Sequence, residues 1–205
     1  SMSKVSCIVL AAGAGRRMGH DENKIFIKLG NKSIIQWTLS HIEQVKAVSE
    51  VILVVADGEA EYMKQHIASL GLSKSIKIIT GGKERQDSVY AGLQAVSDDM
   101  DIVLVHDGAR PLARPELFER VIEGAKTHGA VTIGVPSTDT IKRVDIDGQV
   151  LETLNRNELM NIQTPQGFLK NIFKEAQETA KRDAYLGTDD VSLVEYIGKD
   201  VYILE

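Results

Sequence analysis

Near its start the chain reads VSCIVLAAGAGRR, residues 5–17. The apolar run at positions 5–10 predicts a buried strand, and the glycine-rich turn after it marks the carboxyl end of that strand. Because glycine has no side chain, backbone N–H groups of such a turn can close around phosphate oxygens. Arg16, Arg17 and nearby Lys24 add fixed positive charge. The stretch therefore predicts a strand followed by a loop that binds a nucleotide triphosphate.

Two well-known phosphate-binding motifs do not fit this loop. A P-loop needs Gly-x-x-x-x-Gly-Lys-Ser/Thr, which the chain lacks. The dinucleotide fingerprint needs Gly-x-Gly-x-x-Gly, whereas Gly13, Gly15 and Gly19 leave three residues in the second gap. The fingerprint also has an acidic residue after the second strand, and Asp57 stands at that position. The dinucleotide fingerprint is therefore excluded mainly by the glycine spacing and the arginines. A structural turn with solvated arginines is the alternative, and Asn23-Lys24 favours phosphate binding.

Length and composition narrow the class of protein. The 205 residues predict a single domain, 1–205, and the net charge of −5 argues against a nucleic-acid partner. Cys7 is the only cysteine and the five histidines show no ligand spacing, so no metal site built from protein side chains is expected. We find no signal peptide and no apolar run long enough to cross a bilayer, which predicts a cytoplasmic protein without a membrane partner.

Apolar runs of strand length alternate with helix-like stretches along most of the chain. Strands are predicted at about 5–10, 51–55, 76–79, 102–105, 131–135 and 201–204. Helices are predicted at about 33–45, 59–70, 87–96, 115–127, 169–182 and 189–197. This alternation indicates an α/β fold, with a mostly parallel sheet flanked by helices on both faces.

One segment breaks the alternation. Residues 142–152 alternate polar and apolar side chains around Asp147-Gly148, which is a hairpin signal. We therefore predict a protruding β-arm at about 138–160 that packs against another subunit. A surface flap on a single chain is the alternative.

Other polar residues gather in loops around the predicted strands. In GGKERQDS, residues 81–88, a second glycine turn enters a helix; Asp87 or Ser88 is the candidate N-cap, and Ser88 is also a candidate to face a nucleotide. In HDGARP, residues 106–111, Asp107 and Arg110 either form an ion pair or bind a sugar hydroxyl and a phosphate. Thr164 and Thr188 stand in predicted loops before helices, and Thr188 or Asp189 is the candidate cap of the second helix.

In their order these motifs resemble those of the 2-C-methyl-D-erythritol 4-phosphate cytidylyltransferases of the non-mevalonate isoprenoid pathway. The motifs are AAGxGxRM at 11–18, GGxxRxxSV at 81–89, HDxARP at 106–111, DTxK at 139–142, TPQxF at 164–168 and GTDD at 187–190. The resemblance implies a Rossmann-like nucleotidyltransferase fold and a homodimer interlocked by the arm. It also implies transfer of CMP from CTP to 2-C-methyl-D-erythritol 4-phosphate, giving 4-diphosphocytidyl-2-C-methyl-D-erythritol and pyrophosphate.

The resemblance further implies roles for individual residues. Arg17 and Lys24 would stabilise charge on the α-phosphate and the departing pyrophosphate, and Arg156 would reach the acceptor from the partner subunit's arm as a third catalytic residue. The nucleotide would contact Leu10, Ala11, Ala12, Gly13, Gly15, Arg16, Gly82 and Ser88. The acceptor would contact Asp107, Arg110, Thr140, Thr164 and Thr188. Mg²⁺ would be bound mainly through the CTP phosphates.

One departure and two alternatives accompany the resemblance. The family usually continues into a segment whose lysine helps hold both substrates, whereas this sequence ends at Glu205. We expect a chain that stops there to be impaired.

The nearest alternative is a ribitol-5-phosphate cytidylyltransferase, which uses the same nucleotide loop on another polyol phosphate. The second is an inactive nucleotide-binding or scaffold protein of this fold; Arg17 and Lys24 argue against it, and the missing lysine argues for it.

Overall fold

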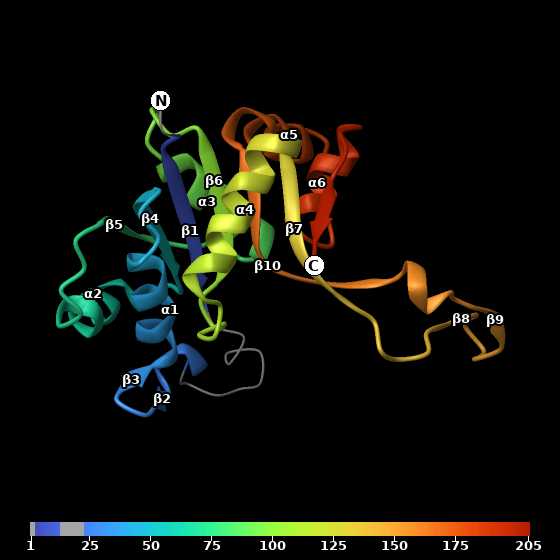
Figure 1. Ribbon diagram of the computed structural model, residues 1–205, viewed down its shortest axis with the longest axis horizontal. Coiled ribbons are helices and arrows are strands. Elements are labelled where there is room, and N and C mark those ends of the chain that lie inside the picture. Colours follow the sequence, from blue (N-terminus) through green and yellow to red (C-terminus); the bar gives the residue numbers. More distant parts are fainter. Residues whose placement is uncertain (1–2, 13–22) are drawn as a thin grey trace.

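The computed structural model describes residues 3–12 and 23–205 (Figure 1). The strands of its central sheet are β1 (Val5–Ala11), β4 (Val48–Val55), β5 (Ser75–Thr80), β6 (Ile102–Asp107), β7 (Ala130–Pro136), β10 (Met160–Leu169) and β11 (Tyr202–Leu204). Their order is β11-β7-β10-β6-β1-β4-β5. All neighbours pair in parallel except β10, which runs antiparallel to β6 and β7. The mostly parallel sheet predicted from the sequence is confirmed.

Helices cover both faces of this sheet. In the described part of the chain they are α1 (Ile34–Glu43), α2 (Ala60–Ala68), α3 (Arg85–Ala95), α4 (Pro115–His128), α5 (Lys170–Arg182) and α6 (Asp190–Tyr196). Successive side chains of a strand point to opposite faces. Val9 of β1 accordingly shares a buried cluster with Leu39 of α1 and Phe118 of α4. Ile8 lies in a second cluster with Phe173 of α5. Because both faces are covered, the strands are apolar without alternation.

One strand of the sheet was predicted as a loop, and that prediction was wrong. The stretch 164–168 lies within β10, where Gln166 and Phe168 are 2% and 0% exposed. The register against β7 shifts between Gln163 and Gln166, and this irregularity accommodates Pro165, which has no N–H for a regular ladder. Pro165 and Gly167 indicate a turn when the sequence is read locally. The local sequence does not reveal that β6 and β7 lie on either side of this segment.

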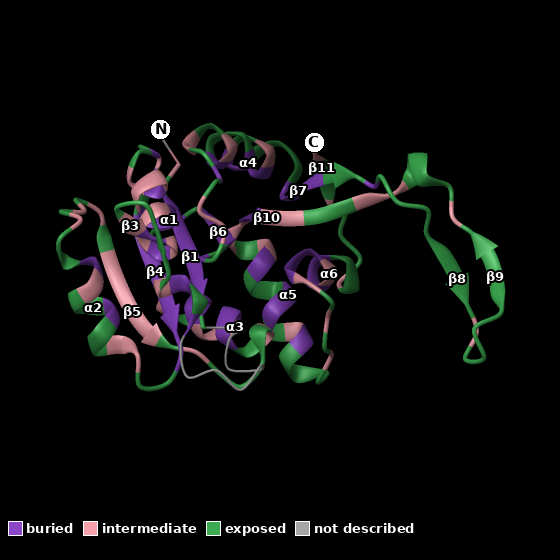
Figure 2. Cartoon of the chain, turned by 90° about the horizontal axis from the view of Figure 1, so that it is seen from below, coloured by how far each residue is buried: buried purple, intermediate pink, exposed green. Residues whose placement is uncertain are grey.

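The arm connects β7 to β10 and extends away from the body (Figure 1). Its hairpin consists of β8 (Lys142–Val144) and β9 (Val150–Thr153), paired antiparallel, and the short 3₁₀ helix η3 (Arg156–Glu158) follows. Both strands are exposed along their whole length (Figure 2). The hairpin predicted around Asp147-Gly148 is therefore confirmed. Among the residues that the structure describes, no helix combines the length and apolarity needed to span a membrane.

Candidate functional site

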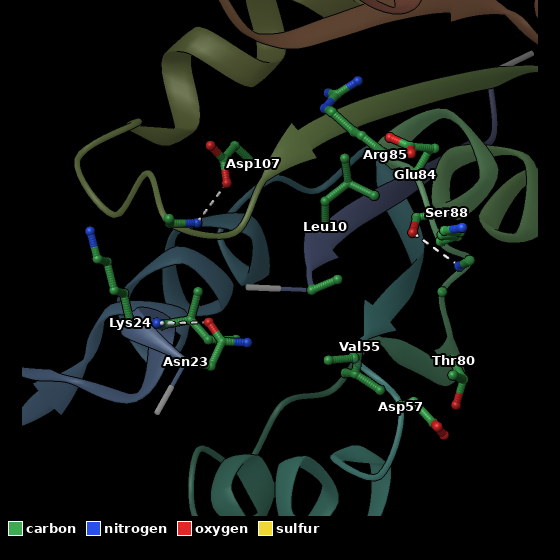
Figure 3. Close-up of a pocket in the computed structure, with 17 residues that line it drawn as sticks. Leu10, Asn23, Lys24, Val55, Asp57, Thr80, Glu84, Arg85, Ser88 and Asp107 are labelled. Carbon is green, nitrogen blue, oxygen red and sulfur yellow. Dashed lines mark hydrogen bonds between the residues drawn. The ribbon is translucent and has the colours of Figure 1, made fainter. Parts of the chain in front are cut away.

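A cavity opens where the carboxyl ends of β1, β4 and β6 meet the loop between β5 and α3 (Figure 3). Its volume of about 720 Å³ is in the range of small-molecule sites. Open α/β sheets bind their ligands outside the carboxyl ends of the strands, which is where this cavity lies. The described residues that line it are Leu10, Ala12, Asn23, Lys24, Ile25, Val55, Ala56, Asp57, Thr80, Gly81, Gly82, Lys83, Glu84, Arg85, Ser88, Asp107 and Ala109.

Lys24 stands on one side of the cavity because Asn23 anchors its backbone. Lys24 begins the 3₁₀ helix η2 (Lys24–Phe26), and Asn23 is its N-cap. The buried Asn23 amide donates to the Ala11 carbonyl oxygen at 2.8 Å and to Glu59 Oε1 at 3.1 Å. Its Oδ1 accepts from the Ile25 N–H at 3.3 Å. The exposed Lys24 is thereby fixed next to the end of β1.

A tight glycine turn forms the opposite side of the cavity (Figure 3). The Gly82 N–H donates to the buried Ser88 Oγ at 3.1 Å. A Cβ on Gly81 would collide with the same hydroxyl, and one on Gly82 would lie 2.5 Å from the Asp87 Cβ. Only glycine at both positions lets the turn close against α3. The helix begins at Arg85, two residues before the predicted start, and Ser88 holds the turn instead of capping the helix.

Asp107, Arg110 and Thr164 meet at the end of β6. The Asp107 N–H donates to Thr164 Oγ1 at 3.0 Å, and the Ala109 N–H donates to Asp107 Oδ1 at 3.0 Å. The Arg110 guanidinium donates to the Thr164 carbonyl oxygen. The Asp107–Arg110 ion pair left open above is not formed between these two described residues. Three residues predicted to contact an acceptor are therefore assembled by bonds among themselves.

His106 supports this assembly from inside the protein. It is fully buried, and burial lowers its pKa to about 3, so the imidazole is neutral. Nδ1 lies 3.1 Å from Thr164 Oγ1. The same hydroxyl accepts from the Asp107 N–H at 3.0 Å, so it contacts both residues. His106 thus orients the Thr164 hydroxyl.

Arg85 connects the glycine-turn side of the cavity to the first residue of α6. Its two terminal guanidinium nitrogens donate to the two Asp190 carboxylate oxygens, each at 3.0 Å. The Asp190 side chain is 2% exposed and that of Arg85 42%. Burial raises the pKa of Asp190, and the Arg85 charge opposes that rise. Asp189, and not Thr188, caps α6, with its carboxylate accepting from the Ser192 N–H at 2.9 Å.

The predicted site residues fall into four groups. Leu10, Ala12, Lys24, Gly82, Ser88 and Asp107 line the cavity, and Ala11 ends β1 beside it. Arg110 and Thr164 contact each other next to Asp107, while Thr188 is exposed in the loop that Arg85 holds. Thr140 and Arg156 belong to the arm. Gly13, Gly15, Arg16 and Arg17 lie outside the described residues.

Sequence reasoning counted Asn23 only as a neighbour of Lys24 in support of phosphate binding and gave no role to His106 or Arg85, although each holds a predicted site residue in place. The only local signal was position, because each stands beside or inside one of the quoted motifs. Their partners are far away in the chain. Within residues 3–12 and 23–205, no three His, Cys, Asp or Glu side chains are grouped so as to hold a metal ion.

Comparisons with known proteins agree on one family. Residues 5–205 match the family model described as IspD, 2-C-methyl-D-erythritol 4-phosphate cytidylyltransferase. The enzyme of that name from Alkaliphilus metalliredigens is 46% identical over 203 residues, which cover 98% of this chain and 84% of the relative. The one from Clostridioides difficile is 46% identical over 196 residues, 96% of this chain and 82% of the relative.

Solved structures point to the same family. The 4-diphosphocytidyl-2C-methyl-D-erythritol synthase structure from Anaerococcus prevotii has a TM-score of 0.89 at 30% identity and covers 100% of this chain and 89% of its own. The 2-C-methyl-D-erythritol 4-phosphate cytidylyltransferase structure from Thermus thermophilus has a TM-score of 0.77 at 30% identity, with coverages of 98% and 88%. The chain belongs to the 2-C-methyl-D-erythritol 4-phosphate cytidylyltransferase family.

Proposed function

We propose that this chain is the enzyme that transfers CMP from CTP to 2-C-methyl-D-erythritol 4-phosphate and releases pyrophosphate. The observation that carries the proposal is the cavity at the carboxyl ends of the strands. Lys24 stands on one side of it, and the Gly81–Ser88 turn stands on the other. A cation opposite a tight glycine turn fits a triphosphate at one end and a base at the other. Membership in the family supports cytidylyl transfer as the reaction.

The reaction needs orientation and charge stabilisation from the protein, and no covalent intermediate. The acceptor phosphate attacks the α-phosphorus in line, and pyrophosphate leaves. Lys24 lies where it stabilises charge on the α-phosphate and the leaving group, and Asn23 keeps it there. Arg17 and Arg16, with Gly13 and Gly15, complete the phosphate loop in this proposal. The base lies near Gly82 and Ser88.

The acceptor lies against the cluster at the end of β6. The Thr164 hydroxyl contacts His106 and the Asp107 N–H, which leaves one of its three hydrogen-bonding positions for a hydroxyl of the polyol substrate. Arg110 and Asp107 stand beside it, and Thr188 contributes from the loop that Arg85 holds. This mixture of hydroxyl, carboxylate and guanidinium groups fits a phosphorylated polyol.

Mg²⁺ enters this site mainly through the nucleotide. The cavity presents an ammonium group and backbone N–H groups, which bind phosphate oxygens. Phosphate oxygens are in turn the ligands that Mg²⁺ favours, with water completing its shell. When bound, the cation neutralises charge on the triphosphate.

The arm is proposed to interlock two copies of the chain into a homodimer. It carries apolar side chains that its own chain leaves open to solvent, among them Ile146 at 100% and Val144 at 51% exposure. A second copy would cover them. Thr140 and Arg156 would then reach the acceptor site of that copy.

Parallel assays with two acceptors test the proposed function. Purified protein is incubated with CTP and Mg²⁺ and either 2-C-methyl-D-erythritol 4-phosphate or ribitol 5-phosphate, and pyrophosphate release is measured. We expect clear preference for the methylerythritol substrate. Preference for ribitol 5-phosphate would replace the acceptor assignment, and binding of CTP without turnover of either would favour the scaffold alternative.

A further inference from the structure

The first turn of α3 holds a loop that lies far from it in the chain. Arg85 forms its two bonds with Asp190, which is 105 residues away. Gln86 adds two more. Its Nε2 donates to the Tyr185 carbonyl oxygen at 2.8 Å, and its Oε1 accepts from the Gly187 N–H at 2.9 Å. Both ends of the Gln86 amide are therefore used to hold the backbone on either side of Leu186.

The other contacts of this loop run to α6 and β10: Tyr185 stacks on Tyr196, Asp189 caps α6 through Ser192, and the Val191 N–H donates to Gln166 Oε1 at 3.2 Å. Leu186 is 68% exposed, so its side chain does not anchor the backbone in the core. Thr188 follows directly and is exposed. Beyond it, the Asp190 carboxylate is buried and paired with Arg85. Thr188 thus lies between two points of contact with α3, at Gly187 and at Asp190.

We infer that Arg85 and Gln86 are positioning residues that set the Thr188 loop against the nucleotide side of the site. The inference rests on the proposed function, in which Thr188 contacts the acceptor. The same turn, Gly81–Ser88, lines the cavity for the nucleotide. One rigid helix end therefore fixes the distance between the two substrates. In-line attack depends on that distance, because a misplacement of about 1 Å lowers the rate of such reactions by about a hundredfold.

Gln86 gives the sharper test, because Arg85 lines the cavity and its loss leaves a buried carboxylate unpaired. Gln86→Ala removes both loop bonds without touching the residues that line the cavity. Gln94→Ala is the matched control, since Gln94 is exposed on the same helix. Initial rates are measured with each substrate varied in turn, together with the melting temperature.

We expect Gln86→Ala to raise KM for the acceptor by at least about tenfold and to leave KM for CTP within about twofold. Gln86→Glu keeps an oxygen that accepts the hydrogen bond from the Gly187 N–H and loses the N–H that donates to the Tyr185 carbonyl. Its KM for the acceptor substrate should therefore lie between those of the unmodified chain and Gln86→Ala. Gln94→Ala leaves both constants unchanged. An unchanged KM for the acceptor in Gln86→Ala, or equal increases for both substrates, would overturn the inference.

Thr188→Val separates this inference from the proposed function. If Thr188→Val leaves KM for the acceptor unchanged, the proposed role of Thr188 is wrong and the inference falls with it. If Thr188→Val raises KM and Gln86→Ala does not, only the positioning role is wrong. Combining both changes should cost less than the product of the two single effects, because Gln86 acts through Thr188.

Arg85 is tested by rescue. Arg85→Gln alone leaves the Asp190 charge without its partner, and pairing it with Asp190→Asn places two neutral amides together. We expect the double variant to recover KM for the acceptor relative to Arg85→Gln. A double variant with a KM at least as high as that of Arg85→Gln would contradict positioning through this pair.

Discussion

Two short 3₁₀ helices present cations that the sequence predicts to be catalytic, and they are built alike. Lys24 begins η2 after the cap Asn23, and Arg156 begins η3 after the cap Asn155. Each cap accepts from the N–H two residues further on. The first cap is buried and also binds β1 and Glu59, whereas the second is exposed and has its other contact, Glu158, within its own turn.

The two cations differ in what fixes their position. Local sequence gives both the same turn and the same cap. Tertiary contacts then fix Lys24 at the end of β1 within one chain. The Arg156 guanidinium donates to the Thr138 carbonyl oxygen at 3.0 Å, still within the arm. Its place relative to a substrate therefore depends on what the arm packs against.

Removal of the anchored cation should have the largest effect. Lys24→Ala is expected to lower turnover by at least about a hundredfold, because charge beside the leaving pyrophosphate acts mainly in the transition state. The rate of pyrophosphate release measures it. Lys64→Ala, an exposed lysine of α2 outside the residues that line the cavity, should keep normal turnover. Turnover within a few-fold of normal in Lys24→Ala would show that Lys24 is not the catalytic cation of this cavity.

Burial of His106 inside the protein also predicts that the free energy of unfolding depends on pH. The pKa of His106 is lowered from 6.5 to about 3, so the unfolded chain binds more protons than the folded one between these values. Stability from this group is complete above pH 6.5 and is lost as the pH falls. At pH 5 the loss is about 2 kcal/mol. Urea unfolding at pH 8, 6 and 5 measures it.

The variant His106→Asn provides the comparison for that pH series. It keeps a hydrogen-bonding partner for the Thr164 hydroxyl but has no group that titrates in this range. Its free energy of unfolding should fall less between pH 8 and 5 than that of the unmodified chain. Parallel pH profiles of the two proteins would contradict the assigned cause.

The arm is tested by mixing two impaired variants and measuring the rate with the acceptor substrate well below its KM, where Arg156→Ala keeps about a tenth of the normal rate. Arg156→Ala should raise KM for the acceptor by about tenfold, the effect of one lost charged hydrogen bond. If Arg156 acts in a second copy, coexpression of Arg156→Ala with Lys24→Ala creates mixed dimers that contain one intact site. Activity then returns to about a quarter of normal, assuming random pairing of two-fold dimers. Arg156 acting within its own chain predicts no recovery.

The caps themselves should give the smallest effects. Asn23→Ala is expected to lower the free energy of unfolding by about 1–2 kcal/mol, and Asn155→Ala by about 0.5 kcal/mol, since an exposed cap has fewer buried bonds to lose. Thermal and urea unfolding of the two variants measure the difference. Equal decreases in the free energy of unfolding would contradict the claim that tertiary contacts anchor η2 more firmly than η3.

Much of the fold was predictable because its signals are local. Strands such as Val48–Val55 are continuously apolar, and the hairpin alternates around a turn that needs the positive φ of Gly148. β10 was missed because its burial comes from β6 and β7, which lie earlier in the chain. The site followed the same rule. The residues after β1, β5 and β6 could be predicted from their place, but the partners of Arg85 and Asn23 could not.

The route of β10 has a mechanical consequence. Its first residues emerge from the arm, its middle carries Thr164, and its end lies in the centre of the sheet. No glycine interrupts it between Met160 and Thr164. A load applied to the arm is therefore carried along one strand to Thr164, the residue proposed to contact the acceptor substrate. If the proposed dimer forms through the arm, substitutions in β10 that alter subunit contact can also shift Thr164, so dimer packing and substrate binding are coupled through this strand.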